Sequence, residues 1–328
     1  MTIRRTLLLL TLAALTGCAA KPMTPQARLD SLLGDHGAAL ENDRVRLSVA
    51  PDVGRIVEFA PASGDNLLWL DPQGRHAEPF TAGGRSVANF GGDKLWPTTQ
   101  ALWERAFGGG GWPPDGVLDG QPWQLSQSPQ RITLESRLQP ALGIRASRTI
   151  ELIDDQPAAR ITNRFHQVQP AVFPVNIWSI TQVQRPPHVL MDVAPDAPTP
   201  PGNWMPLADP ENVAAHPPRL LQGSDVLAWQ LPTDVPAKIG TLGRWVAAVY
   251  DDLIFLQVTS RDPDAMYPDA SSAQIFTCPA YTELELLTEA RHLEPGQTMQ
   301  NVVTWHLLPR EGDSLEAAAT QIEQFLAK

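Results

Sequence analysis

Cysteine is almost missing from this sequence. The 328 residues include only two, Cys18 and Cys278. Two cysteines can form at most one disulfide bond, so a disulfide-rich fold is excluded. Stability must therefore come from an apolar core, and 43% of the residues are hydrophobic. Thirty-two prolines accompany them, which indicates an ordered protein with many loops.

Positive charge is the second shortage. Lysine and arginine together number 25, against 36 aspartates and glutamates, so the formal net charge is −11 at pH 7. An acidic surface argues against binding to nucleic acid and against docking on anionic lipid headgroups. We therefore expect no nucleic-acid partner.

The N-terminal apolar stretch, residues 7–15, is too short to cross a bilayer as a mature helix. Because Arg4 and Arg5 precede it, the stretch has the form of a secretory signal. It ends in Leu15-Thr16-Gly17-Cys18, which resembles a bacterial lipobox. The alternative is an ordinary secretory signal with a chance cysteine.

The lipobox resemblance implies that residues 1–17 are a lipoprotein signal peptide and that Cys18 becomes a lipidated N-terminus. Acyl chains would then provide the membrane contact. Residues 18–40 would serve as a polar tether that holds the domain off the membrane. Ala19 in place of an acidic residue implies an outer-membrane lipoprotein of the bacterial cell envelope, facing the periplasm.

Motifs for nucleotide and nucleophile chemistry are missing as well. The sequence contains no P-loop, no dinucleotide-binding fingerprint and no nucleophile elbow, so we expect no cofactor. The histidines are scattered without the spacing of zinc ligands, and we expect no metal centre. They are His36, His76, His166, His188, His216, His292 and His306.

Strand patterns are abundant, and strand–helix alternation is absent. About fifteen short segments alternate between apolar and polar residues or form short apolar runs between turn residues. They are 44–49, 54–59, 66–70, 123–126, 131–138, 144–153, 158–168, 172–183, 227–231, 237–240, 245–250, 253–259, 274–278, 281–288 and 299–308. Residues 172–183 are the most apolar, which predicts a central strand.

This pattern predicts one all-β domain over residues 41–310, a large antiparallel sandwich or a barrel. No internal repeat is visible, which disfavours a propeller. Residues 186–218 are rich in proline and are expected to be irregular. Residues 314–326 predict a C-terminal helix capped by Ser314, so that residues 311–328 pack on the domain. A short helix is also expected around residues 27–33.

The stretch from Asn89 to Trp123 is unusual in composition. It holds four of the ten tryptophans and eight glycines, with Trp-Pro at 96–97 and again at 112–113. Such a density of glycine and proline disfavours a helix or a central strand, whereas four indoles disfavour disorder. We therefore predict a long, ordered loop with aromatic walls, and loops of this kind are usually functional.

Three local patterns resemble the galactose-mutarotase-like superfamily. The run Gly91 to Pro97 is similar to the Gly-Gly and Trp-Pro loop of hexose-phosphate mutarotases, and residues 118–125 follow it as in aldose epimerases. Ile161-Thr162-Asn163 resembles the strand that precedes their central active-site strand. Residues 281–285 and 293–296, followed by Trp305, resemble their last strands.

The resemblance covers roughly residues 41–309, and an uncharacterised bacterial branch of the superfamily, a domain of unknown function, is the most similar. It implies a large two-sheet antiparallel sandwich and a saccharide ligand. Sugar mutarotases place a general-acid histidine on the central strand and a general-base glutamate on a late strand, because ring opening needs both.

This sequence departs from that catalytic pattern. Its central strand contains Trp178 and Gln182 but no histidine. The late glutamate corresponds to Glu283 or Glu285, which project to the same side of one strand, and the sequence leaves open which of them enters the site. His166, at the end of the preceding strand, is a candidate for a displaced acid. If the protein is an enzyme, the resemblance implies an aldose-1-epimerase-like isomerase.

Candidate ligand-binding residues lie mainly in the aromatic stretch. Indole planes suit the C–H faces of sugars, and polar side chains suit their hydroxyl groups. Trp96 and Trp112 are the preferred stacking surfaces, although both can instead be buried anchors. The full set is Asn89, Lys94, Trp96, Gln100, Trp112, Asp115, Trp178 and Gln182. Asp115 and Asp119 could alternatively hold a hard cation, but turn formation is the commoner role of aspartate.

Three functions remain open on these observations. The first is a lipid-anchored protein that binds a saccharide without standard mutarotase chemistry. The second is an active aldose epimerase or other sugar-modifying enzyme, in which a late glutamate works with His166, Lys94 or Asp115. The third is a structural or assembly lipoprotein that uses the tryptophan-rich loop against a protein partner.

Overall fold

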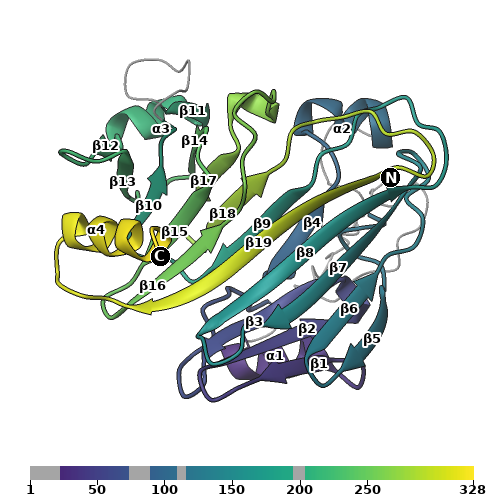
Figure 1. Ribbon diagram of the computed structural model, residues 1–328, viewed down its shortest axis with the longest axis horizontal. Coiled ribbons are helices and arrows are strands. Elements are labelled where there is room, and N and C mark those ends of the chain that lie inside the picture. Colours follow the sequence, from purple (N-terminus) through teal and green to yellow (C-terminus); the bar gives the residue numbers. More distant parts are fainter. Residues whose placement is uncertain (1–22, 74–88, 109–115, 195–203) are drawn as a thin grey trace, which may run out of the picture.

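Two large antiparallel sheets packed face to face form this protein (Figure 1). The computed structural model describes residues 23–73, 89–108, 116–194 and 204–328. The architecture is the large two-sheet sandwich that the strand pattern and the family resemblance predicted.

The nine-stranded sheet has the central strand β9 in its middle, as the apolar character of residues 172–183 predicted. Its order is β1 (Ala38–Glu41), β2 (Val45–Ala50), β3 (Arg55–Pro61), β4 (Asp93–Trp96), β9 (Trp178–Val183), β18 (Thr282–Leu287), β17 (Ala273–Thr277), β14 (Ala237–Thr241) and β11 (Met205–Ala208).

The ten-stranded sheet contains the two longest strands, β8 and β19, side by side (Figure 1). Its order is β12 (Arg219–Leu220), β13 (Val226–Gln230), β10 (His188–Asp192), β15 (Trp245–Val249), β16 (Leu253–Val258), β19 (Thr298–Pro309), β8 (Ala158–Gln167), β7 (Ile144–Leu152), β6 (Arg131–Glu135) and β5 (Gln124–Ser128).

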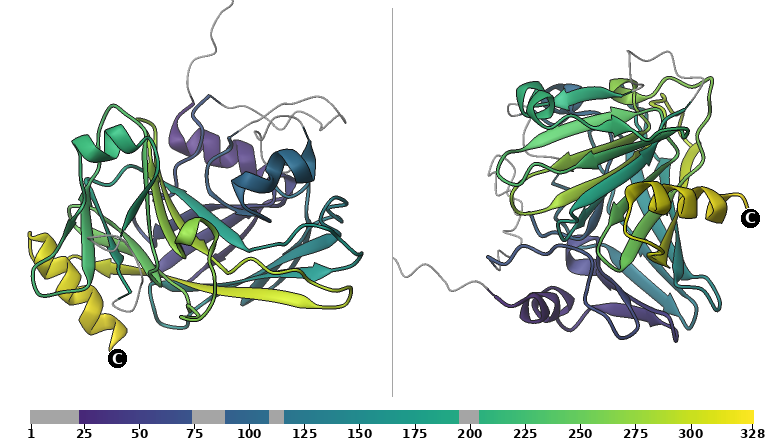
Figure 2. Two further views of the ribbon diagram at one scale, coloured as in Figure 1. Left: turned by 90° about the horizontal axis from the view of Figure 1, so that it is seen from above. Right: turned by 90° about the vertical axis from the view of Figure 1, so that its left-hand side faces the viewer.

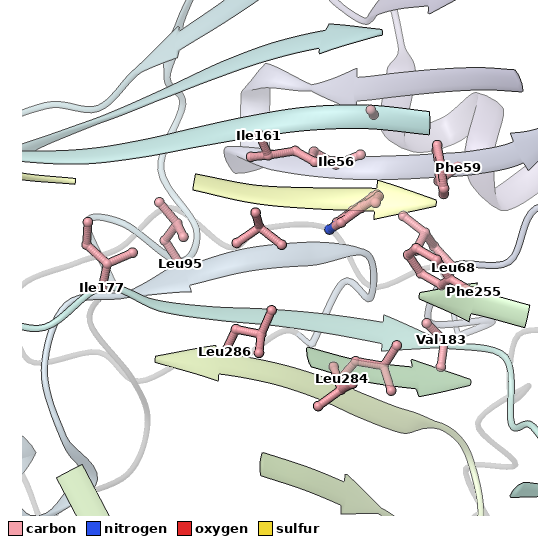
Figure 3. Close-up of a cluster of buried hydrophobic side chains, with 14 of the residues drawn as sticks. Ile56, Phe59, Leu68, Leu95, Ile161, Ile177, Val183, Phe255, Leu284 and Leu286 are labelled. Carbon is pink, nitrogen blue, oxygen red and sulfur yellow. The ribbon is translucent and has the colours of Figure 1, made fainter. Parts of the chain in front are cut away.

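The main core lies between the sheets. On β8, Ala159, Ile161 and Phe165 point into it, whereas Arg160 and Arg164 are exposed on the other face. The same alternation on the nine-stranded sheet directs its own apolar side chains inward, and Figure 3 shows residues of both sheets meeting there. Burial of one face of each sheet is the main source of stabilisation in such a sandwich.

Short helices lie around the two sheets (Figure 2). They are α1 (Pro25–Leu33), α2 (Gln100–Phe107), α3 (Pro210–Ala215) and α4 (Leu315–Leu326), together with the 3₁₀ turns η1 (Pro51–Val53) and η2 (Pro268–Ala270). Ser314 caps α4 as predicted, because its side chain accepts a hydrogen bond from the amide of Ala317. The apolar stripe of α4 packs on the outer face of the ten-stranded sheet.

The N-terminal boundary of the domain lies earlier than the sequence suggested. Leu29 and Leu32 of α1 are buried against Val57 and Phe90, and β1 pairs with β2. Residues 25–41 are therefore part of the packed domain and do not form a free tether. The short helix was expected around residues 27–33, but its packing against the sheet was not, and a four-residue edge strand is too short to give a strong periodic signal.

The prediction of one continuous loop from Asn89 to Trp123 was wrong. This stretch contains the strand β4 and the helix α2. Gly92 precedes β4, Pro97 separates the two elements, and Gly108 ends the helix with φ +72°. Composition averaged over the whole stretch concealed these two short elements.

Two further expectations also need correction. Residues 186–218 are not wholly irregular, because β10, β11 and α3 lie there. Residues 66–70 do not form a full strand but make isolated bridges, Leu68 to Val183 and Leu70 to Gly91. Within the described ranges, no helix is long and apolar enough to cross a membrane.

Candidate functional site

Polar and aromatic side chains gather on the outer face of the nine-stranded sheet, over β4, β9, β18, β17 and β14. We call this surface the site face. The pairing of the strands places Lys94 beside Ile180 and Glu285, and Lys238 beside Phe276 and Glu283. Because side chains alternate along a strand, the neighbours of these residues, such as Leu95 and Leu284, point into the core between the sheets.

Glu285 is fully buried at the centre of the site face. Its Oε2 accepts hydrogen bonds from the indole Nε1 of Trp178 at 2.7 Å and from Nζ of Lys238 at 2.8 Å. Its Oε1 has no hydrogen-bond partner among the described residues. Burial raises the pKa of Glu285 to about 7, although the nearby ammonium of Lys238 opposes the shift. Near neutral pH this carboxyl group therefore exists in both protonation states.

Glu283 lies two residues away on the same face, and its side chain is 10% exposed. Its Oε1 accepts a hydrogen bond of 2.8 Å from Nε2 of Gln182 and lies 3.9 Å from Nζ of Lys94. Burial lowers the pKa of Lys94, although the neighbouring carboxylates, first Asp119 and then Glu283, oppose this. Lys94 also lies over the ring of Trp96, 4.3 Å from its centroid, in a cation–π contact.

Three tryptophans form a packed cluster at one end of the site face. Trp96 lies edge-on to Trp103 and to Trp178, with ring centroids 4.7 and 5.1 Å apart. Trp103 comes from α2, so the cluster fastens this helix to the sheet. Nε1 of Trp96 donates to Asp119, which also pairs with Arg55. All three indoles are almost fully buried, and Trp96 is therefore an anchor and not an exposed stacking surface.

Partly exposed aromatic rings lie at the other end. Trp69 and Tyr281 face each other with ring centroids 4.5 Å apart, and Phe276 lies 6.2 Å from Tyr281. Phe276 is directly opposite Glu283 on the paired strand. Burial raises the pKa of the Tyr281 hydroxyl group, which therefore stays protonated at neutral pH and bonds to Asn89. The combination of partly exposed rings with a nearby carboxylate suits the C–H faces and hydroxyl groups of a sugar.

Gly91 and Gly92 have a structural role that the sequence did not reveal. Both have positive φ, +85° and +73°. A Cβ atom at Gly91 would collide with the carbonyl oxygen of Trp69, and one at Gly92 would collide with that of Ile56. The two glycines thus allow close approach of the chain to itself, so that Trp69 lies beside β9.

The structure brings together six of the residues predicted from sequence: Lys94, Trp96, Trp178, Gln182, Glu283 and Glu285. Asn89 joins their edge through Tyr281. Gln100 is exposed in the first turn of α2 and has no contact with either glutamate among the described hydrogen bonds. Cys18, Trp112 and Asp115 lie outside the described residues. The cation site proposed for Asp115 and Asp119 lacks support, because Asp119 pairs with Arg55 and Trp96.

His166 is not part of this arrangement. It lies on β8 of the other sheet, where its side chain is exposed and its Nδ1 is 3.2 Å from Oγ1 of Thr298. Its neighbour Phe165 points into the core, so His166 faces outward on the far side of the sandwich from Glu283. The hypothesis of His166 as a displaced acid is therefore wrong.

Sequence reasoning missed Lys238, Trp69, Phe276 and Tyr281. Lys238 is one of only four lysines in the sequence, and that scarcity was the available signal. Phe276 and Tyr281 flank the turn between β17 and β18, whereas Trp69 comes from a distant segment that no local pattern connects to them. Only the tertiary structure shows that Trp69 packs on Tyr281 and that Phe276 lies opposite Glu283.

The fold that these elements build is the galactose-mutarotase-like sandwich. A candidate mutarotase (YeaD) from Salmonella typhimurium has a TM-score of 0.53 and 10% sequence identity, over 84% of this chain and 90% of that chain. A TPR-domain containing protein from Parabacteroides distasonis has a TM-score of 0.53 and 13% identity, over 84% and 47%.

A galactose mutarotase-like protein from Lactobacillus casei has a TM-score of 0.49 and 9% identity, over 83% and 100%. No protein-family model matches the sequence, and no curated protein does. At such low identity the two matches with a TM-score of 0.53 confirm the predicted fold and no more.

Proposed function

We propose that this protein binds a saccharide on the site face, without standard mutarotase chemistry. The observation that carries the proposal is a row of partly exposed rings, in which Trp69 packs on Tyr281 and Tyr281 lies beside Phe276, and Phe276 is directly opposite Glu283 on the paired strand. Oε1 of Glu283 is engaged with Gln182 and Lys94, whereas Oε2 accepts no hydrogen bond from the described residues. Oε2 is therefore available for a sugar hydroxyl group stacked beside the rings.

The charged groups favour binding over ring opening. A mutarotase needs an acid and a base on opposite sides of the sugar ring. Lys94 and Glu283 are 3.9 Å apart, and Lys238 and Glu285 are 2.8 Å apart. Each cation thus lies against its carboxylate, which leaves no room for a ring between them. No described histidine takes the place of the acid on β9.

A sugar-modifying enzyme is the second candidate, and Glu285 is the observation in its favour. A buried carboxyl group with a pKa of about 7 is suited to accept and return a proton at neutral pH. The convergence of Trp178, Trp96 and both glutamates on one face supports a small ligand over the third possibility, a protein partner bound through an aromatic loop.

The same proposal places the protein in the bacterial cell envelope. The lipobox-like residues support acylation of Cys18, retention in the outer membrane and a domain that faces the periplasm. We expect Cys18→Ala to abolish metabolic labelling with palmitate and to move the protein from the membrane fraction to the soluble fraction. Unchanged labelling and fractionation would contradict the anchor.

The binding proposal is tested by titrating the protein with mono- and oligosaccharides while tryptophan fluorescence is recorded. We expect Trp69→Ala to weaken binding about tenfold, as for the loss of roughly 1.4 kcal/mol of ring contact. Glu283→Gln is titrated in the same way, with Glu151→Gln as its matched control, because Glu151 pairs with Arg131 on the ten-stranded sheet, away from the site face. Absence of binding to every saccharide would refute the proposal.

The enzyme alternative is separated from binding by NMR. Each sugar that binds is followed for the exchange of its anomers, with and without protein. Exchange at the uncatalysed rate supports a binding protein. Acceleration that is lost in Glu285→Gln but kept in Glu151→Gln would establish the enzyme instead.

A further inference from the structure

Cationic side chains on the site face are all paired with carboxylates. Strands β4, β9, β14, β17 and β18 contain two such residues, Lys94 and Lys238, and these face Glu283 and Glu285. Arg55 from the neighbouring strand β3 pairs with Asp119. Within the part of the chain that the structure describes, these strands therefore present no excess positive charge.

The two lysines are further occupied by aromatic rings. Nζ of Lys94 lies 4.3 Å from the ring centroid of Trp96, and Nζ of Lys238 lies 4.7 Å from that of Trp178. Both ammonium groups are thus held between an indole and a carboxylate. A phosphate or carboxylate ligand would have to displace the glutamate to reach either one, because a buried anion needs a compensating charge.

The polar atoms left over on these strands are oxygens. On these five strands, the buried side-chain atoms that have no hydrogen-bond partner among the described residues are Oε1 of Gln182, Oε1 of Gln274 and Oε1 of Glu285. Gln182 is fixed in this orientation, because its Nε2 donates to Glu283. Acceptor oxygens attract hydroxyl and amino hydrogens and repel the oxygens of an anion.

We propose that Glu283 and Glu285 determine specificity by neutralising Lys94 and Lys238, so that the site face rejects anionic sugars. This inference rests on the proposed saccharide site. It gives the two glutamates a role distinct from proton transfer, because each acts as the charge partner of a lysine. Removing either carboxylate frees an ammonium group and converts the face into one that accepts a phosphorylated or carboxylated sugar.

The test compares a neutral sugar with its own 6-phosphate and its uronic acid. Calorimetric titrations at pH 6 and pH 8 use wild type, Glu283→Gln, Glu285→Gln and the control Glu151→Gln. We expect wild type to bind the anionic forms at least about tenfold more weakly than the neutral form. At pH 8 either site variant should bind the anionic forms about tenfold more tightly than wild type does, as expected for one charge-assisted hydrogen bond. At pH 6 the gain in affinity of Glu285→Gln should be smaller, because the wild-type carboxyl group, with a pKa of about 7, is then largely protonated and no longer neutralises Lys238.

The affinity that Glu283→Gln gains for the uronic acid should decrease as the pH rises and Lys94 loses its proton. Burial already lowers the pKa of Lys94, and loss of Glu283 removes a charge that opposes that shift. Glu151→Gln also frees a cation, Arg131, but this cation lies on the ten-stranded sheet. The variant should therefore gain no affinity for the anionic sugars. Thermal melts of each variant establish that it is folded.

The outcomes separate this inference from the proposed function. If wild type binds the 6-phosphate as tightly as the neutral sugar, the specificity role is overturned and the saccharide site stands. If folded Glu283→Gln and Glu285→Gln gain no affinity for anionic sugars, the role is likewise overturned. If wild type binds no sugar of any kind, the proposed function fails, and the two variants titrated with the phosphorylated sugar still decide whether freed lysines attract anions.

Discussion

Asp93 and Lys94 are neighbours on β4 and enter ion pairs on opposite faces of the same sheet. Asp93 points into the core, where Arg148 reaches it from the ten-stranded sheet. Oδ2 of Asp93 accepts hydrogen bonds from Thr181 and Ser179, and the three guanidinium nitrogens of Arg148 donate to Asp93 and Asn163. Every oxygen and nitrogen of this pair has a partner.

The ion pairs on the site face have fewer of their polar atoms hydrogen-bonded. Lys94 is 3.9 Å from Glu283. Among the residues that the structure describes, Oε2 of Glu283 accepts no hydrogen bond and the buried Oε1 of Glu285 has no partner. Unsatisfied polar atoms in a folded protein usually mark strain or a functional site. The comparison therefore assigns a structural role to the core pair and a recognition role to the site-face pairs.

The largest expected effect follows from removing Arg148. In Arg148→Met the carboxylate of Asp93 stays buried without its counter-charge, which typically costs about 3–5 kcal/mol. Denaturant unfolding measures the loss. The matched control is Arg131→Met, whose partly exposed pair with Glu151 should contribute less than about 1 kcal/mol. Equal losses in the two variants would contradict the structural role of the core pair.

A smaller effect is expected in the pH dependence of stability. The folded-state pKa of Glu285, about 7, lies above its ordinary value of 4.5, so the folded state binds this proton more tightly. The stability that this tighter proton binding by Glu285 contributes is fully present below pH 4.5 and is lost as the pH rises through 7. Glu285→Gln should therefore lose less stability than wild type between pH 4.5 and pH 8.

Other groups titrate in the same range, so the contribution of Glu285 is the difference in the pH dependence of stability between wild type and Glu285→Gln. Burial raises the pKa of Asp192 to about 6 and lowers that of His306 to about 4. Thermal melts across the range provide the measurement. Parallel curves for wild type and Glu285→Gln would show that the proton is not bound more tightly on folding.

The smallest expected effect is that of Lys94→Met. The side chain of Glu283 is 10% exposed and keeps its hydrogen bond from Gln182, so loss of the lysine should cost at most about 1–2 kcal/mol. Saccharide binding should change more than stability. A loss as large as that of Arg148→Met would show that both pairs are structural, and the distinction drawn between them would fail.

Much of the sandwich was predictable because its signals are local. Alternation along β8 identified the residues that face the core, and Ser314 marked the start of α4. Spacing alone placed Glu283 and Glu285 on one side of a strand, as the structure confirms. The short strand β4 and helix α2 were missed, because four and eight residues give too few periods to stand out beside glycine and proline.

The sequence by itself determined most of the strands, their buried sides and the presence of tryptophans, lysines and late glutamates that the site face would need. Only the tertiary structure decided which of them meet. The pairings of β9 with β4 and β18 bring Lys94 within 3.9 Å of Glu283, and the pairings of β17 with β14 and β18 bring Lys238 within 2.8 Å of Glu285, each lysine reaching the glutamate diagonally across the register. Alternation reflects local backbone geometry, whereas the register between distant strands depends on side chains from the whole sheet packing at once.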